Sequence, residues 1–171
     1  PLIAPDFSHL AHNVARQKLT QWLRDQMMRQ QFEVEMRDGP ATLPAAIAEM
    51  ARALPGKIIA EDLTWTESTY RKLMIGTEAL AGALARDLSP DRGERIGVML
   101  PTVNGAMVTT LALWSLGKTP AYLNYSSGGP VMVSCARLAG LRQVLTSRVF
   151  LEKARLNLAP LEEAGLRFIY L

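Results

Sequence analysis

The polar loop at residues 124–129, Asn-Tyr-Ser-Ser-Gly-Gly, is the stretch of this sequence best suited to bind an anion. It lies between an expected strand and an expected helix, where backbone N–H groups can point at a phosphate. A catalytic phosphate loop also needs a lysine beside it, and none occurs between Lys118 and Arg137. We therefore expect the glycines to form the turn, and Ser127 or a neighbour to cap the helix that begins near Pro130.

Histidine and cysteine, the residues most suited to metal binding or nucleophilic catalysis, are scarce. His9 and His12 are three residues apart and would share one helix face, but two imidazoles do not complete a metal site. The single cysteine, Cys135, falls on an apolar helix face with Val131 and Leu138, so we expect it to pack in the core. We assign no catalytic, cofactor-binding or metal-binding residue.

Composition excludes several classes of protein. The chain has 171 residues, of which 49% are hydrophobic and 20% charged, as expected for one globular domain with an appended segment. A net charge of +3 arises from 19 basic and 16 acidic residues that are interspersed, so nucleic acid is not an expected partner. One cysteine excludes an internal disulfide and favours a reducing, cytoplasm-facing compartment. No secretory signal is apparent, and the initial proline suggests a processed or excised segment.

The 22 residues from 96 to 117 carry no charge and are long enough to cross a membrane. Proline, asparagine and glycine interrupt them, and the apolar spacing changes from a continuous run to a helical period. We therefore predict a buried strand, a turn and a helix that Pro101 opens. The Gly-x-Gly-x-x-Gly fingerprint is missing after this strand, which excludes a nicotinamide or flavin dinucleotide site.

The first forty residues predict a linker helix. Apolar residues recur at three to five positions over residues 7–37, and Asp-Gly-Pro at 38–40 ends the pattern. We divide the chain into this linker, residues 1–40, and an α/β region, residues 41–171. Trp22, Leu23 and Met27 are expected to face that region or a neighbouring chain.

The α/β region alternates short apolar runs with helical segments. We expect strands at 57–61, 64–66, 95–100, 119–123, 143–146 and 167–171, and helices at 43–54, 67–86, 102–116, 130–139 and 149–158, with Thr66 capping the second helix. Each connection after residue 94 is long enough for a right-handed crossover. The predicted fold is therefore a layered α/β structure, a mainly parallel sheet covered by helices.

Several of these segments resemble one known family. The run Glu94-Arg95-Ile96-Gly97-Val98-Met99-Leu100-Pro101 resembles the first strand of AMP-forming acyl-activating enzymes, the acyl-CoA and acyl-carrier-protein synthetase superfamily. Gly117-Lys118-Thr119-Pro120-Ala121, Leu123-Asn124-Tyr125-Ser126-Ser127-Gly128 and Leu145-Thr146-Ser147-Arg148 follow in that family's order and spacing. The resemblance implies that residues 41–171 are part of the N-terminal subdomain of such a synthetase.

Within the superfamily, the chain is most similar to acyl-carrier-protein synthetases fused to a lysophospholipid acyltransferase. The similar segments are Asn124-Tyr125, residues 145–151, Phe168-Ile169-Tyr170-Leu171, Glu61-Asp62-x-Thr64, Ser68-x-Tyr70-Arg71-Lys72 and the linker with Met27-Met28. This implies a parent enzyme that uses ATP and magnesium to adenylate a fatty acid. The acyl group would then pass to acyl carrier protein and on to a lysophospholipid, on the cytoplasmic side and in association with the inner membrane.

The family's main functional segments are implied to lie beyond Leu171. They are the phosphate loop ending in Pro-Lys-Gly, the adenine-contacting Gly-Thr-Glu, the ribose-binding Asp and the adenylating Lys. Residues 126–129 are not that loop, since Pro-Val-Met follows them. We therefore expect a fragment that binds no cofactor and is inactive alone. We also expect it to self-associate, through the strand at 167–171 or through the helix at 7–37. The alternative is a free-standing α/β scaffold module, and the full reading frame would distinguish the two.

Overall fold

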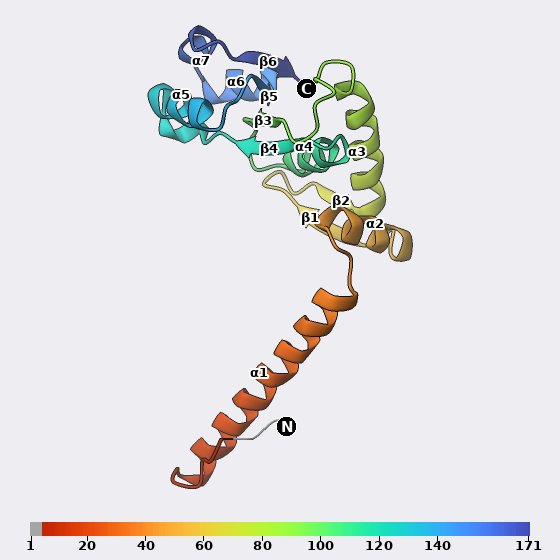
Figure 1. The fold of residues 1–171 in the computed structure, drawn as a ribbon, viewed down its shortest axis with the longest axis vertical. Coiled ribbons are helices and arrows are strands. Elements are labelled where there is room, and N and C mark those ends of the chain that lie inside the picture. Colours follow the sequence, from red (N-terminus) through yellow and green to blue (C-terminus); the bar gives the residue numbers. More distant parts are fainter. Residues whose placement is uncertain (1–4) are drawn as a thin grey trace. The chain divides into compact units, whose positions relative to one another are not determined.

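The computed structural model describes residues 5–171 and divides the chain into two compact units, Pro1–Ala46 and Ile47–Leu171 (Figure 1). The main element of the first unit is α1 (His12–Asp38), which ends where the Gly39 N–H donates to the Glu35 carbonyl oxygen at 2.8 Å. The expected end of this helix is confirmed, but its expected start is wrong. A turn precedes His12, in which the Ser8 N–H donates to the Asp6 carboxylate at 2.8 Å.

Apolar side chains lie all around α1. Every residue of this helix is at least partly exposed, including Leu23 at 48% and Met27 at 70%. At 3.6 residues per turn, Met28 and Phe32 fall on the side roughly opposite Leu23. The apolar residues of α1 therefore do not form a single face. That Trp22, Leu23 and Met27 contact the α/β region or another chain stays a prediction.

Two helices and a hairpin precede the main sheet. They are α2 (Leu43–Ala53), β1 (Ile58–Glu61), β2 (Glu67–Thr69) and α3 (Tyr70–Leu84), with β1 and β2 antiparallel. The expected strand at 64–66 is wrong, because these residues form the turn between β1 and β2. The expected cap at Thr66 is also wrong, since Thr69 Oγ1 accepts the Lys72 N–H at 3.3 Å and so caps α3.

The main sheet has four parallel strands in the order β4-β3-β5-β6, which confirms the predicted layered α/β fold. The strands are β3 (Arg95–Val98), β4 (Thr119–Tyr122), β5 (Gln143–Thr146) and β6 (Arg167–Tyr170). The connections contain α4 (Asn104–Ser115), the 3₁₀ turn η1 (Tyr125–Ser127), α5 (Gly129–Leu138), α6 (Arg148–Ala154) and α7 (Ala159–Glu163).

Several helix boundaries differ from the expected ones, and two of the differences have a clear local cause. The expected helix at 149–158 ends early, at Ala154, because Arg155 adopts a left-handed conformation with φ of 49° and ends α6. Helix α7 is a separate helix that was not expected from the sequence. Helix α4 begins at Asn104 rather than directly after Pro101, since the Val103 N–H bonds the Pro101 carbonyl oxygen at 2.9 Å in a tight turn. Residues 96–117 are a strand, a loop and a helix, as predicted. In the described part of the chain, no helix combines the length and apolar character that crossing a membrane requires.

The sheet has a separate apolar core on each face. Helices α3 and α4 pack on one face, against Ile96 and Leu145, whereas α5, α6 and α7 pack on the other, against Met99 and Val144. Neighbouring residues of one strand serve different cores because their side chains point to opposite faces. Gly97 is needed on the α5 side, since a Cβ there would lie 2.9 Å from the Val144 side chain. These cores hold the strand ends, and the loops that follow them, in place.

Candidate functional site

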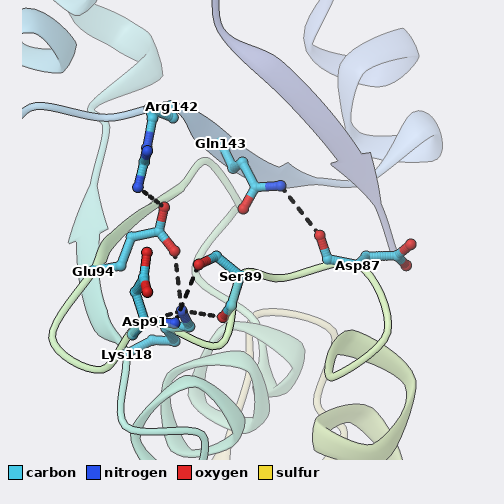
Figure 2. A network of polar contacts seen from close by, with 7 residues as sticks. All are labelled: Asp87, Ser89, Asp91, Glu94, Lys118, Arg142 and Gln143. Atoms are coloured by element: carbon cyan, nitrogen blue, oxygen red, sulfur yellow. Dashed lines mark hydrogen bonds and ion pairs between the residues drawn. The ribbon is translucent and has the colours of Figure 1, made fainter.

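A buried lysine lies at the amino end of the sheet (Figure 2). Lys118 is 4% exposed, and its Nζ donates to the carbonyl oxygens of Ser89 at 2.5 Å and Asp91 at 2.7 Å, and to Glu94 Oε2 at 3.0 Å. Arg142 Nη2 donates to the other oxygen of Glu94 at 2.9 Å. All three ammonium protons have acceptors, so this cluster holds the loop before β3 in place and is not a reaction site.

The carboxyl end of the sheet has the geometry of a ligand site. Strand β3 continues through α4 to β4 on one side, whereas β5 continues through α6 and α7 to β6 on the other. The two outgoing loops therefore diverge, and ligands of open α/β sheets bind in the crevice that opens at such a point. A cavity of about 670 Å³ lies there, within the size range of small-molecule sites. We call it the crevice; its lining includes Leu100, Val103, Tyr125, Val149, Phe150 and Lys153.

Polar and aromatic contacts hold the walls of the crevice. The buried Thr146 hydroxyl donates to the Met99 carbonyl oxygen at 2.8 Å and joins the ends of β5 and β3. The rings of Tyr125 and Phe150 meet edge to face, with centroids 4.9 Å apart. The Arg148 guanidinium lies 4.5 Å from the centre of the Tyr170 ring, a cation–π contact between α6 and β6. The crevice is thus largely preformed.

The chemistry of the crevice is apolar. Among the residues that the structure describes, Lys153 is the only charged side chain of its lining, and no acidic side chain contributes to it. Residues 5–171 also contain no group of three histidine, cysteine or acidic side chains placed to hold a metal. The arrangement suits the hydrocarbon part of a ligand, with a single cation available for an anionic group.

The loop at 124–129 uses its polar groups internally. Asn124 Oδ1 accepts the Ser126 N–H at 3.0 Å, and the Ser127 hydroxyl donates to the Asn124 carbonyl oxygen at 2.7 Å. Helix α5 begins after Gly128, which has φ of 83°, and no side chain caps it. The expectation that a glycine forms the turn is confirmed. The expected Ser127 cap is wrong, because the Ser127 hydroxyl bonds the Asn124 carbonyl oxygen within the 124–129 loop and does not bond α5.

The expected environments of the cysteine and the histidines are also wrong. Cys135 is exposed, and its neighbours Val131 and Leu138 are 50% and 89% exposed. Met132 and Ala136 form the buried side of α5 instead, so the apolar face that carries Cys135 points to solvent. His9 lies in the turn before α1, whereas His12 is the first residue of α1, and so they do not share a helix face.

An aspartate ties the β1–β2 turn to the start of α4. The Asp62 carboxylate accepts the N–H and hydroxyl of Thr64 at 2.9 and 2.6 Å and the Asn104 N–H at 3.3 Å. The Asn104 side chain donates to the Thr66 carbonyl oxygen at 2.6 Å. The hydrogen bond from Thr64 is the main reason that the pKa of Asp62 lies below its usual value. This link positions the first turn of α4, which contributes Gly105 to the crevice.

Reasoning from the sequence missed the crevice. Leu100, Val149 and Lys153 have no chemical signature, and they approach one another only because β3 and β5 are neighbours. The Asp62 link has a weak signal, the spacing of Asp62, Thr64 and Thr66, which is typical of a side-chain-stabilised turn. Neither feature could be placed without the strand order.

Comparison with known proteins supports this topology. No family model matches the chain. A curated protein, isopenicillin N epimerase component 1 of Hapsidospora chrysogena, is 31% identical over 81 residues, which are 47% of this chain and 12% of that protein. This chain therefore spans only a small part of that relative.

Solved structures match a larger share of the chain. The N-terminal subdomain of Klebsiella oxytoca NpsA, in complex with 3-hydroxyanthranilyl-AMSN, matches with a TM-score of 0.62 and 18% identity over 75% of this chain and 30% of that chain. A benzoate CoA ligase from Burkholderia xenovorans LB400 matches with a TM-score of 0.61 and 23% identity over 75% and 25%. NpsA-ThdA, an artificially fused adenylation–PCP di-domain from Klebsiella oxytoca, also matches, with a TM-score of 0.61 and 18% identity over 74% and 23%. The chain has the fold of the N-terminal subdomain of adenylating enzymes.

Proposed function

We propose that this chain is the N-terminal subdomain of an AMP-forming ligase that activates a fatty acid. The observation that carries the proposal is spatial. The runs that resemble acyl-activating enzymes supply Leu100, Tyr125 and Ser147, which come from three different loops and line one crevice in a fold of adenylating type.

The segments quoted above further support a particular parent, the bifunctional 2-acylglycerophosphoethanolamine acyltransferase/acyl-ACP synthetase. Its reaction begins when a fatty acid carboxylate attacks the α-phosphorus of ATP and releases pyrophosphate. The thiol of acyl carrier protein then displaces AMP from the acyl carbon, and a lysophospholipid hydroxyl finally takes the acyl group. The match to a fused adenylation–PCP di-domain supports a carrier protein as partner.

The residues of this chain do not fit magnesium-ATP. The crevice offers one lysine and no acidic side chain among the described residues, whereas a triphosphate with its metal needs concentrated donors and charge. The tripeptide Gly76-Thr77-Glu78 lies inside α3, where Thr77 is buried, and so presents no loop to an adenine. In our proposal, this chain forms an apolar wall of the acyl site and other segments of the parent bind the nucleotide.

We expect the isolated chain to bind magnesium-ATP with no measurable affinity and to form no acyl-AMP. Calorimetric titration checks the first expectation, and fatty-acid-dependent exchange of labelled pyrophosphate into ATP checks the second. The full-length parent, assayed in parallel, should support the exchange. Micromolar binding of magnesium-ATP by the isolated chain would contradict the proposal that other segments of the parent bind the nucleotide. A full-length protein that shows no pyrophosphate exchange would contradict the proposed function.

Filling the crevice should affect long acyl chains more than short ones. Val149 is 59% exposed and lines the crevice, so Val149→Trp in the full-length enzyme narrows it without disturbing a core. We expect KM for a sixteen-carbon fatty acid to rise about tenfold, a loss of about 1.4 kcal/mol of binding, with little change for an eight-carbon acid. Val131→Trp, at a half-exposed position on α5 outside the crevice lining, is the control. Equal effects on both chain lengths would show that the crevice does not hold the acyl chain.

A further inference from the structure

A second hollow lies between α2 and α3. Its lining residues come from an earlier part of the sequence than those of the crevice. This groove has a volume of about 350 Å³, and its lining is Ala48, Ala51, Arg52, Pro55, Arg71, Met74 and Ile75. The small alanines make the α2 side shallow, whereas Met74 and Ile75 form the opposite wall. Ile75 is 64% exposed, and the alanines are half-buried. The groove is therefore a recess with an apolar floor.

Positive charge surrounds this recess. Arg52 and Arg71 line it, and neither side chain has a hydrogen-bond or ion-pair partner within residues 5–171. Lys57 and Lys72 lie beside them and are exposed. The Arg71 N–H bonds the Pro55 carbonyl oxygen at 3.0 Å, and the Tyr70 N–H bonds that of Lys57 at 3.2 Å, so the two basic segments are held together.

Helix α3 adds to the positive potential. Arg71 and Lys72 are in its first turn, where the helix dipole already disfavours cations, and this turn contains no acidic residue. The only acidic residues of the two helices, Glu49 and Glu78, do not line the groove. The arrangement costs stability in the free chain, and a negatively charged partner would remove that cost.

We propose that the α2–α3 groove docks an acidic amphipathic helix of a partner protein. Apolar side chains of that helix would enter the recess over Ala48 and Ala51, and its flanking carboxylates would pair with Arg52 and Arg71. This is helix-in-groove recognition with complementary charge. An anionic membrane fits less well, because insertion requires protruding apolar side chains and, of the described residues that line the groove, only Ile75 is a largely exposed apolar residue. The docking surface lies outside the crevice and does not depend on the proposed function.

The test uses two fluorescein-labelled 18-residue helical peptides. Both carry leucines at positions i, i+3, i+4 and i+7, flanked by glutamates in one peptide and by lysines in the other. Fluorescence anisotropy with the 171-residue chain should show binding of the glutamate peptide only, with at least tenfold weaker affinity in 0.5 M salt. Binding of both peptides, or of neither, would overturn the proposal.

A charge swap makes the test specific. The double variant Arg52→Glu, Arg71→Glu should bind the glutamate peptide with at least tenfold lower affinity than the parent chain. It should also bind the lysine peptide, which the parent chain does not. Glutamate is favourable in the first turn of α3 but unfavourable in the last turn of α2, so the two changes should largely offset each other in melting temperature, and circular dichroism verifies folding. Arg137→Glu, at an exposed arginine on α5, is the matched control and should bind like the parent chain.

A third variant and a lipid control complete the experiment. Ala51→Phe fills the recess and should abolish binding of the glutamate peptide while the arginines remain. Vesicles containing phosphatidylglycerol test whether the groove binds an anionic membrane instead of a helix. If the chain sediments with these vesicles through Arg52 and Arg71 but binds no acidic peptide, the groove is a lipid contact and the proposal is wrong.

Discussion

Replacing Lys118 with methionine is expected to lower the free energy of unfolding by about 3–5 kcal/mol. The methionine keeps the apolar stem but removes the ammonium group that Glu94 and the carbonyl oxygens of Ser89 and Asp91 share. The acceptors would lose this shared donor, among them Glu94 Oε2 on a side chain that is only 9% exposed, and buried polar groups are costly when unpaired. Denaturation by urea, followed by circular dichroism at low micromolar concentration, measures the change.

The same carboxylate provides the control. Arg142 also binds Glu94, but its side chain is 70% exposed, so Arg142→Met should cost only about 0–1 kcal/mol. Combining Lys118→Met with Glu94→Gln should be less destabilising than the sum of the two single variants, because the uncompensated buried charge is gone. If Lys118→Met and Arg142→Met had equal small effects, the buried cluster would not stabilise the loop before β3.

The isolated 171-residue chain is expected to form dimers or larger species at high micromolar concentration. Strand β6 is an edge of the described sheet. The N–H groups of Arg167 and Leu171 donate to the carbonyl oxygens of Arg142 and Thr146 on the β5 side, both at 2.9 Å. Alternate residues of a parallel strand point the other way, so the Tyr170 N–H is free for a strand of another copy. Light scattering coupled to size exclusion measures the mass.

A proline distinguishes edge pairing from other association. Tyr170→Pro removes the outward N–H and leaves the inward bonds to β5 in place, because proline is tolerated on the edge of a sheet. We expect this variant to shift the concentration for half-association upward at least tenfold. Tyr170→Ala loses the ring over Arg148 but keeps the N–H, and should associate like the parent chain. A parent chain that stays monomeric would show that the edge of β6 is not an association site.

Local patterns were sufficient for the sheet and for most of its helices. The four parallel strands lie within the expected ranges because short apolar runs bounded by polar turns depend on nearby residues alone. The parallel arrangement also followed, since long connections and a fixed crossover hand leave few alternatives. Boundaries were less accurate where two nearby residues competed, as when Thr69 rather than Thr66 capped α3.

The sequence by itself determined the layered α/β class and the lack of a lysine-bearing phosphate loop within these residues. The tertiary structure decided which loops meet, because strand order depends on pairing between distant segments: β3 and β5 are neighbours although β4 lies between them in the chain. It also decided that Lys118 is buried and that Cys135 is exposed. Helical spacing shows that Cys135, Val131 and Leu138 share a face of α5, but it does not show whether that face points toward the core or toward solvent. Burial of a side chain is set by what packs against it, and here those partners come from segments far away in the sequence.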